Sequence, residues 1–187
     1  MTSRLRRWLA RAIPPVYVAL VTAVWLVPVA PLAVRATSAA RAGHVSALIA
    51  LALGALGFSV GAMAPARWLA LRDWERNGSL YARIGVRRFR TIALHGDVMN
   101  RLRRRLAGGT PVAGPTIARR AALTRWILYN ERIHWAWVLG TPPLIVWGAA
   151  SGYALLATST FLALVPLNLY PIALQRYKRG RLARIDS

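Results

Sequence analysis

The chain alternates between long apolar runs and shorter segments rich in arginine. Four apolar runs occupy residues 14–34, 44–64, 127–148 and 153–174. The first two runs are about 20 residues long, the length that a hydrocarbon core of roughly 30 Å requires of a helix. Because lipid offers no hydrogen-bond partner to open backbone, each run is predicted to be a helix. The sequence therefore predicts an all-α integral membrane protein, with four transmembrane helices in a single membrane domain, residues 1–187.

A polar segment, residues 65–126, separates the second run from the third. We expect this segment to be helical, amphipathic and cytoplasmic. Residues 71–81 and 124–135 mix apolar and charged positions, which is typical of helices that lie in a membrane interface. Residues 66–135 hold four of the five acidic residues and 15 of the 26 cations. Polar chemistry, if the protein performs any, is therefore expected in this part of the chain.

The distribution of positive charge predicts how the chain crosses the membrane. Four cations precede the first run, two lie between the first and second, 15 lie in the centre, none separates the third from the fourth, and five follow. Because cytoplasmic loops carry the excess of Lys and Arg, this alternation predicts a multi-pass protein with both termini cytoplasmic. Two alternatives are a cleaved signal peptide in place of the first helix and a three-span chain with one fused helix, 144–165.

The composition of the chain limits the kinds of molecule that we expect it to bind. The net charge is +21, but the basic residues flank apolar spans rather than line a soluble face, so we expect no nucleic acid and instead a lipid bilayer with anionic headgroups. The basic group at residues 101–105, with Arg119 and Arg120, either holds such headgroups or docks a phosphate-bearing donor. There is no cysteine, which excludes thiol nucleophiles, thiolate metal sites and disulfides. The sequence does not predict an oligomeric state.

Three glycines follow one face of the second predicted helix. Gly54, Gly57 and Gly61 lie three and four residues apart. Small residues at this spacing let two helices approach closely in lipid, so helix packing is the favoured interpretation. A lipid-binding groove is the alternative.

Glu131 and His134 are candidate catalytic residues. They are three residues apart and share one face of a helix, where the third apolar run begins. A carboxylate beside an imidazole fixes its tautomer and raises its basicity, which suits a general base acting on a hydroxyl. An interfacial ion pair is the structural alternative. A metal site of the Glu-x-x-His type would need further ligands, for which only His95 and Asp97 are at hand, so we expect no metal.

A second polar string begins at Trp74 and ends at Gly78. Asn77-Gly78 predicts a turn or a helix stop. Glu75 is predicted to pair with a nearby cation, either Arg76 or Arg72.

Three motifs resemble those of a bacterial integral-membrane family, the glycosyl-4,4'-diaponeurosporenoate acyltransferases of staphyloxanthin-type carotenoid biosynthesis. The motifs span residues 74 to 182 in the family's order. They are Trp74-Glu75-Arg76-Asn77-Gly78-Ser79-Leu80-Tyr81-x-x-Ile84-Gly85-Val86-Arg87-Arg88-Phe89-Arg90, then Glu131-x-x-His134-Trp135, then Asn168-x-x-Pro171-x-x-x-Gln175-Arg176-Tyr177-Lys178-Arg179-x-Arg181-Leu182.

The resemblance implies a transferase of the bacterial cell (inner) membrane that moves a fatty acyl group onto a hydroxyl of a glycosylated lipid or carotenoid. It implies no bound cofactor, with an acyl donor such as acyl-CoA as cosubstrate and a lipid-like acceptor. His134 would act as the base and Glu131 would orient its ring. The residues it implies in substrate binding are Trp74, Glu75, Asn77, Gly78, Tyr81, Trp135, Asn168, Gln175, Arg176, Tyr177 and Arg179. The alternative is a non-catalytic four-span protein that binds lipid or a partner subunit through its basic segment.

Overall fold

The computed structural model describes residues 29–76, 78–86, 88–89 and 117–184, with isolated positions before residue 29. The described part is all helical and contains no strand. Most of the first predicted span, 14–34, lies outside the described residues, as do the basic group 101–105 and the side chains of Arg119 and Arg120.

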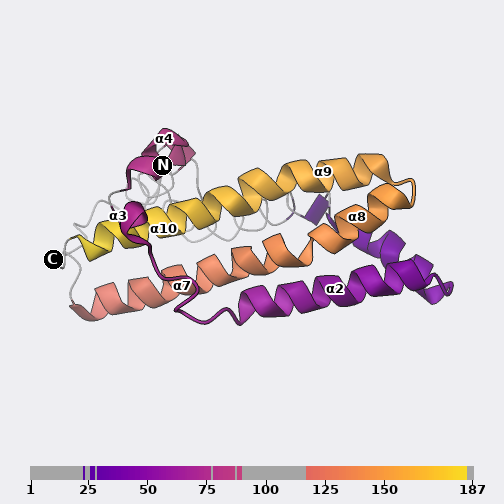
Figure 1. Ribbon diagram of the computed structural model, residues 1–187, viewed down its shortest axis with the longest axis horizontal. Helices are drawn as coiled ribbons and strands as arrows, with labels where there is room; N and C mark the ends of the chain where they lie inside the picture. The colour runs from indigo at the N-terminus through magenta and orange to yellow at the C-terminus, as the bar shows by residue number, and fades with distance from the viewer. Residues whose placement is uncertain are drawn as a thin grey trace, which may run out of the picture.

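Long helices lie side by side along one axis (Figure 1). After a helical stretch at residues 29–41, the elements in order are α2 (Val45–Ala62), α3 (Asp73–Arg76), α4 (Ser79–Arg83), α7 (Ile117–Gly140), α8 (Pro142–Ala150), α9 (Ala154–Leu164), the π-helical turn η1 (Val165–Leu169) and α10 (Tyr170–Ala183). α9, η1 and α10 form one continuous rod, which runs beside α7 and α8 (Figure 1).

Two helices of the described part are long and apolar enough to cross a membrane. They are α2 and the rod at residues 154–183, and less than a third of each apolar window is buried inside the structure. On α2 the large side chains point outward, with Leu48, Leu53 and Leu56 at least half exposed. An aqueous surface rarely carries so continuous an apolar face, whereas lipid requires one. The exposed apolar helices therefore indicate association with a membrane.

The third predicted helix, 127–148, is two helices in the structure. α7 begins well before the predicted start, at Ile117, and ends at Gly140. α8 then restarts at Pro142-Pro143, because proline lacks the N–H that would continue the ladder but is tolerated in a first turn. The carbonyl oxygen of Trp137 accepts both the backbone N–H of Thr141 at 3.0 Å and its hydroxyl at 2.6 Å, which holds Thr141 against the end of α7.

The fourth predicted span, 153–174, continues much further than expected, to Ala183. Pro166 does not end the helix, because the π-helical turn η1 accommodates the missing N–H, and Pro171 stands in the first turn of α10. The fused helix at 144–165, on which the three-span alternative relied, is not formed. A turn at Ser151–Gly152, where the glycine has a φ of +85°, separates α8 from α9.

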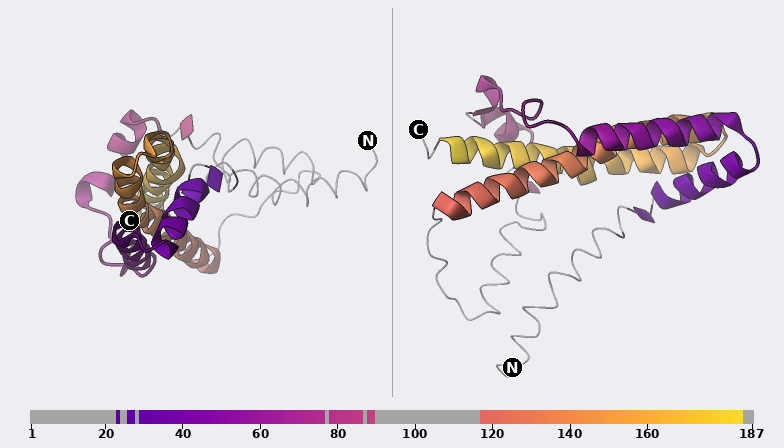
Figure 2. Two further views of the ribbon diagram at one scale, coloured as in Figure 1. Left: turned by 90° about the vertical axis from the view of Figure 1, so that its right-hand side faces the viewer. Right: turned by 90° about the horizontal axis from the view of Figure 1, so that it is seen from below.

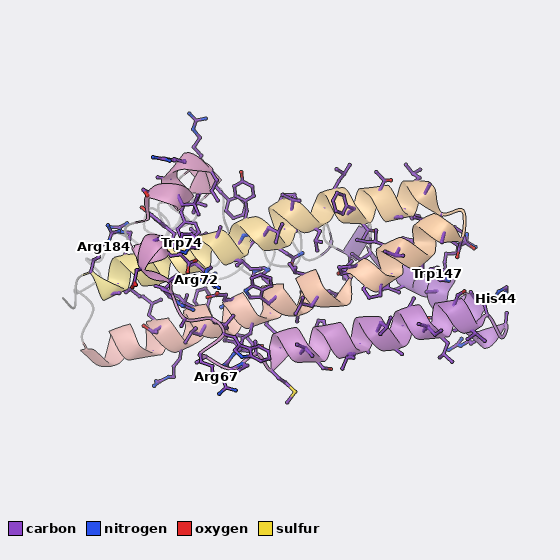
Figure 3. The ribbon with its side chains drawn as sticks, in the orientation of Figure 1. His44, Arg67, Arg72, Trp74, Trp147 and Arg184 are labelled. Atoms are coloured by element: carbon purple, nitrogen blue, oxygen red, sulfur yellow. The ribbon has the colours of Figure 1, made fainter. Side chains whose placement is uncertain are left out.

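One apolar core cluster lies at the end of the bundle where α8 turns into α9. Leu32, Ala36, Ala47 and Ala50 pack there against Trp147. Figure 3 places Trp147 and His44 at this end and the labelled Arg67, Arg72 and Arg184 at the other.

The glycines of α2 pack against another helix, as the packing interpretation predicts, and the structure identifies that helix as α7. A Cβ added to Gly57 or Gly61 would collide with the backbone of Leu139 or Ala136, and one added to Gly54 would lie 2.9 Å from the carbonyl oxygen of Gly140. Figure 2 shows α2 running close along its neighbours from two further directions. The packing interpretation is confirmed, and the groove interpretation is wrong because the backbone of α7 fills the glycine face.

We predict that Gly57→Ala destabilises the protein by about 1–3 kcal/mol, because the added methyl forces two helix backbones apart. The measurement is thermal unfolding in detergent, followed by circular dichroism. Ala55→Val adds a larger group to an exposed position of the same helix and should change the midpoint little. Equal midpoints for the two variants would contradict the close packing of α2 on α7.

Candidate functional site

A crossing segment, residues 64–83, passes over the polar ends of α7 and α10 and carries the short helices α3 and α4 (Figure 1). Arg132 on α7 fixes its start by donating through Nε to the carbonyl oxygen of Ala64 at 2.8 Å, a contact that the sequence did not suggest. Gly78, with a φ of +69°, breaks the predicted interfacial helix 71–81 into two. The predicted turn is thus confirmed at Gly78, while Asn77 lies outside the described residues.

Glu75 on α3 is buried and receives four hydrogen bonds. Arg176 holds it in a two-pronged ion pair, with Nε 2.6 Å from Oε1 and Nη2 2.8 Å from Oε2. The backbone N–H of Arg72 donates to Oε2 at 2.8 Å, and the hydroxyl of Tyr81 donates to Oε1. The partner of Glu75 is therefore Arg176, 101 residues away, and Arg72 contributes its backbone rather than its guanidinium. The side chain of Arg76 lies outside the described residues.

Glu131 on α7 is completely buried and lies between two arginines. Arg176 Nη1 is 2.9 Å from Oε1, and Arg179 Nη1 is 2.7 Å from Oε2. The same arginines also donate to the crossing segment, Arg176 to the carbonyl oxygen of Ala70 at 3.3 Å and Arg179 to that of Leu69. Arg176 and Arg179 are three residues apart on α10, so both reach the same face.

We call Glu75, Glu131, Arg176, Arg179 and Tyr81 the charge cluster. It joins α3, α4, α7 and α10, and its two carboxylates balance its two guanidinium groups. Buried charges are tolerated when paired and hydrogen-bonded, and each charged atom described above has such a partner.

The cluster shifts the acidity of its members on the crossing segment. Burial raises the pKa of the Glu75 carboxyl, but hydrogen bonds from Arg176, the Arg72 amide and Tyr81 outweigh that effect, and the pKa falls from 4.5 to about 2. Burial, followed by the hydrogen bond to the Glu75 carboxylate, raises the pKa of Tyr81. Glu75 is therefore ionised and Tyr81 is a neutral donor at neutral pH.

His134 lies one helical turn from Glu131 but does not pair with it. Its Nδ1 is 3.2 Å from Oδ1 of Asn168, which is buried on η1. The prediction that Glu131 orients the ring is wrong in this structure, because both carboxylate oxygens are held by arginines. Asn168, expected only as a substrate-binding residue, is the ring's partner among the described residues. The metal alternative loses its carboxylate ligand for the same reason, and His95 and Asp97 lie outside the described residues.

The other predicted site residues surround the cluster or lie apart from it. Tyr177 is buried with Tyr81, Val86 and Leu174, and its ring contacts Gly78, where a Cβ would lie 3.2 Å away. Gln175 is buried, and its Oε1 has no partner in the described part of the chain.

The remaining predicted site residues are two tryptophans. Trp135 is half-buried, with an indole N–H that finds no partner among the described residues. Trp74 is half exposed and lies with Arg72 and Arg184 at the basic end of the bundle (Figure 3). The structure thus brings Glu75, Gly78, Tyr81, Glu131, Arg176, Tyr177 and Arg179 together, and places His134 with Asn168 beside them.

Fold and site together define a small, helical, membrane-associated protein, with a paired charge cluster and a histidine at the polar end of its apolar helices. The chain belongs to the glycosyl-4,4'-diaponeurosporenoate acyltransferase family, whose model matches residues 65–186. No curated protein and no solved structure matches it. The matched region contains every charge-cluster residue, His134 and Asn168, which confirms the family resemblance of the three motifs.

The lowered pKa of Glu75 predicts a pH-dependent stability. A carboxyl whose folded-state pKa lies below its unfolded value stabilises the fold fully above about pH 4.5 and loses that contribution as pH falls toward 2. We expect wild type to be more stable than Glu75→Gln at pH 6, and that difference to shrink by about 2 kcal/mol at pH 3. Unfolding by circular dichroism at both pH values measures it.

Asp73→Asn is the matched control, because it removes an exposed acid from the same short helix. A stability difference between wild type and Glu75→Gln that stays constant from pH 6 to pH 3 would show that the ion pair does not hold the carboxylate in its charged form.

Proposed function

We propose that the protein is an integral-membrane acyltransferase that transfers a fatty acyl group to a hydroxyl of a glycosylated lipid or carotenoid, with His134 as general base. The observation that carries this proposal is the His134–Asn168 pair, which lies one helical turn from Glu131 of the charge cluster in a chain of an acyltransferase family. The class of reaction follows from the family, and the choice of acceptor and donor is part of the proposal.

The chemistry needs one base and one activated acyl donor. Nε2 of His134 takes the proton from the acceptor hydroxyl while the oxygen attacks the carbonyl carbon of a thioester such as acyl-CoA. The new C–O bond forms, the C–S bond breaks, and the thiolate leaves with the proton that the ring has carried. An ester and a free thiol result, and the ring returns to its neutral form.

The charge cluster has a structural role in this scheme. Arg176 directs its N–H groups at Glu75, Glu131 and the carbonyl of Ala70, so it is already engaged and is a poor donor to a developing oxyanion. Both carboxylate oxygens of Glu131 likewise accept hydrogen bonds from arginines. The cluster instead fixes the crossing segment, which bears Trp74 and Tyr81, against the helices that carry His134 and Asn168.

We further propose four membrane spans with both termini cytoplasmic. A helix that starts at Ala154 crosses roughly 30 Å in about 20 residues and reaches the interface near Leu174. The charge cluster then lies in the cytoplasmic interface and the His134–Asn168 pair slightly deeper. Exposed Trp68, Trp74 and Arg67 suit the headgroup level, where an acceptor's sugar would also lie.

Reporter fusions test the topology. Alkaline phosphatase joined after Gly43 or Gly152 should be active outside the cytoplasm, and green fluorescent protein joined at either terminus should fluoresce inside. Phosphatase activity from a fusion within residues 65–126 would place the crossing segment on the outer side, away from cytoplasmic acyl-CoA, and would contradict the proposal.

His134→Gln should abolish acylation while the protein accumulates in membranes as wild type does. Glu131→Gln should act differently, because Arg179 loses the carboxylate that it pairs with and Arg176 keeps only Glu75, and breaking a buried pair costs about 3–5 kcal/mol. We expect that variant to lower the amount and thermal stability of folded protein. Mass spectrometry of lipid extracts from expressing cells measures the product as a mass gain of one fatty acyl unit. Normal product from His134→Gln would remove the catalytic assignment.

A further inference from the structure

Asn168 on η1 is buried and contacts His134, but one of its polar atoms has no partner among the residues that the structure describes. It lies on the π-helical turn η1, its side chain is 1% exposed, and its Oδ1 meets Nδ1 of His134 at 3.2 Å. Its Nδ2 is buried and has no hydrogen-bond partner within the described part of the chain. A buried donor without a partner destabilises a fold. Such a group is available to a ligand, and π turns inside α-helices are frequent at functional sites.

The chemistry of the amide determines the state of the ring. A side-chain carbonyl oxygen only accepts hydrogen bonds, so the nitrogen that faces it, Nδ1, carries the proton. Nε2 on the opposite edge of the ring then presents a lone pair, as a general base requires. A neutral amide also suits this depth in the bundle, since a carboxylate here would need a counter-charge of its own, as Glu131 does.

We propose that Asn168 is the positioning residue of His134: its carbonyl oxygen holds the ring in the Nδ1–H tautomer, and its unpartnered amide N–H binds the carbonyl oxygen of an acyl ester or thioester. The second half rests on the proposed function, whereas the first half concerns the ring alone. One side chain thus orients the base and supplies a donor where negative charge develops during acyl transfer.

The tautomer is tested without any substrate. The full-length chain, labelled with ¹⁵N-histidine and placed in lipid nanodiscs at pH 7.5, has three histidines, and His134→Gln assigns the signal of interest. We expect wild type to show a protonated Nδ1 and an unprotonated Nε2. Asn168→Ala should convert the ring to the Nε2–H tautomer that a free imidazole prefers. A wild-type Nε2–H ring, or an unchanged tautomer in Asn168→Ala, overturns the positioning role.

The donor role is tested by turnover with palmitoyl-CoA and glycosyl-4,4'-diaponeurosporenoate in the same nanodiscs. Asn168→Ala should lower kcat by about 10²-fold and change KM little, because the lost donor acts mainly in the transition state. Asn168→Asp keeps an acceptor for Nδ1 but lacks the N–H, so it should stay at least about tenfold below wild type. Recovery of wild-type kcat by Asn168→Asp overturns the donor role.

Ser159→Ala is the matched control. It removes a side-chain hydrogen bond, to the carbonyl oxygen of Leu156, from the same rod without touching His134, and it should retain wild-type kcat. The two proposals fail separately. Turnover by His134→Gln overturns the proposed function and leaves the tautomer result standing, while full activity of Asn168→Ala in a protein that needs His134 overturns only the inference on Asn168.

Discussion

The structure depends on the pairing of charges that have been taken out of water. Glu75 and Glu131 are 2% and 0% exposed, and two arginines three residues apart on α10 neutralise both. A single unpaired buried charge destabilises the folded state by more than any one packing contact stabilises it. The two carboxylates and the two guanidinium groups are therefore expected to pair together on folding. Because they belong to three separate elements, their pairing determines where the crossing segment lies on α7 and α10.

That pairing also determines the surroundings of His134. Glu131 and His134 are one turn apart on α7, while Asn168 and Arg176 are about two turns apart on the rod. The long side chain of Arg176 spans the difference, so the same antiparallel register that joins Glu131 to the arginines brings the ring to Asn168. The charged pairs of Glu131 with the arginines hold the helices in register. The neutral pair of His134 with Asn168 depends on that same register, and it orients the ring.

Local patterns predicted part of this arrangement. Apolar runs predicted helices within residues 44–64, 127–148 and 153–174, the glycine spacing on α2 predicted close packing against a neighbouring helix, and Gly78 predicted the turn in the crossing segment. Each of these features depends on residues that are close together in the sequence or that lie on one face of a single helix. The break at Thr141 was also readable, since Pro142-Pro143 follows it, but the apolar run obscured it.

Pairing partners were not predictable in the same way. The spacing of Glu131 and His134 permits a contact on any helix, yet Arg176 and Arg179 compete for the carboxylate and prevail, because an ion pair in a low-dielectric site is stronger than a hydrogen bond to a neutral ring. One signal was available. The chain has 26 cations and five acids, so cationic partners are available to every buried carboxylate. Two arginines on one helix face, such as Arg176 and Arg179, can bind the two oxygens of one carboxylate.

The separation of charged and neutral pairs matters for acyl transfer in a membrane. A base that depended on a buried carboxylate would bring an additional negative charge close to the developing oxyanion and weaken it. Here the carboxylates are neutralised by Arg176 and Arg179, and the ring has a neutral amide as its partner. The charged pairs that hold the helices together are therefore separate from the pair that holds the ring. Under the proposed function, the base and the amide donor therefore act next to carboxylates whose charge the arginines already balance.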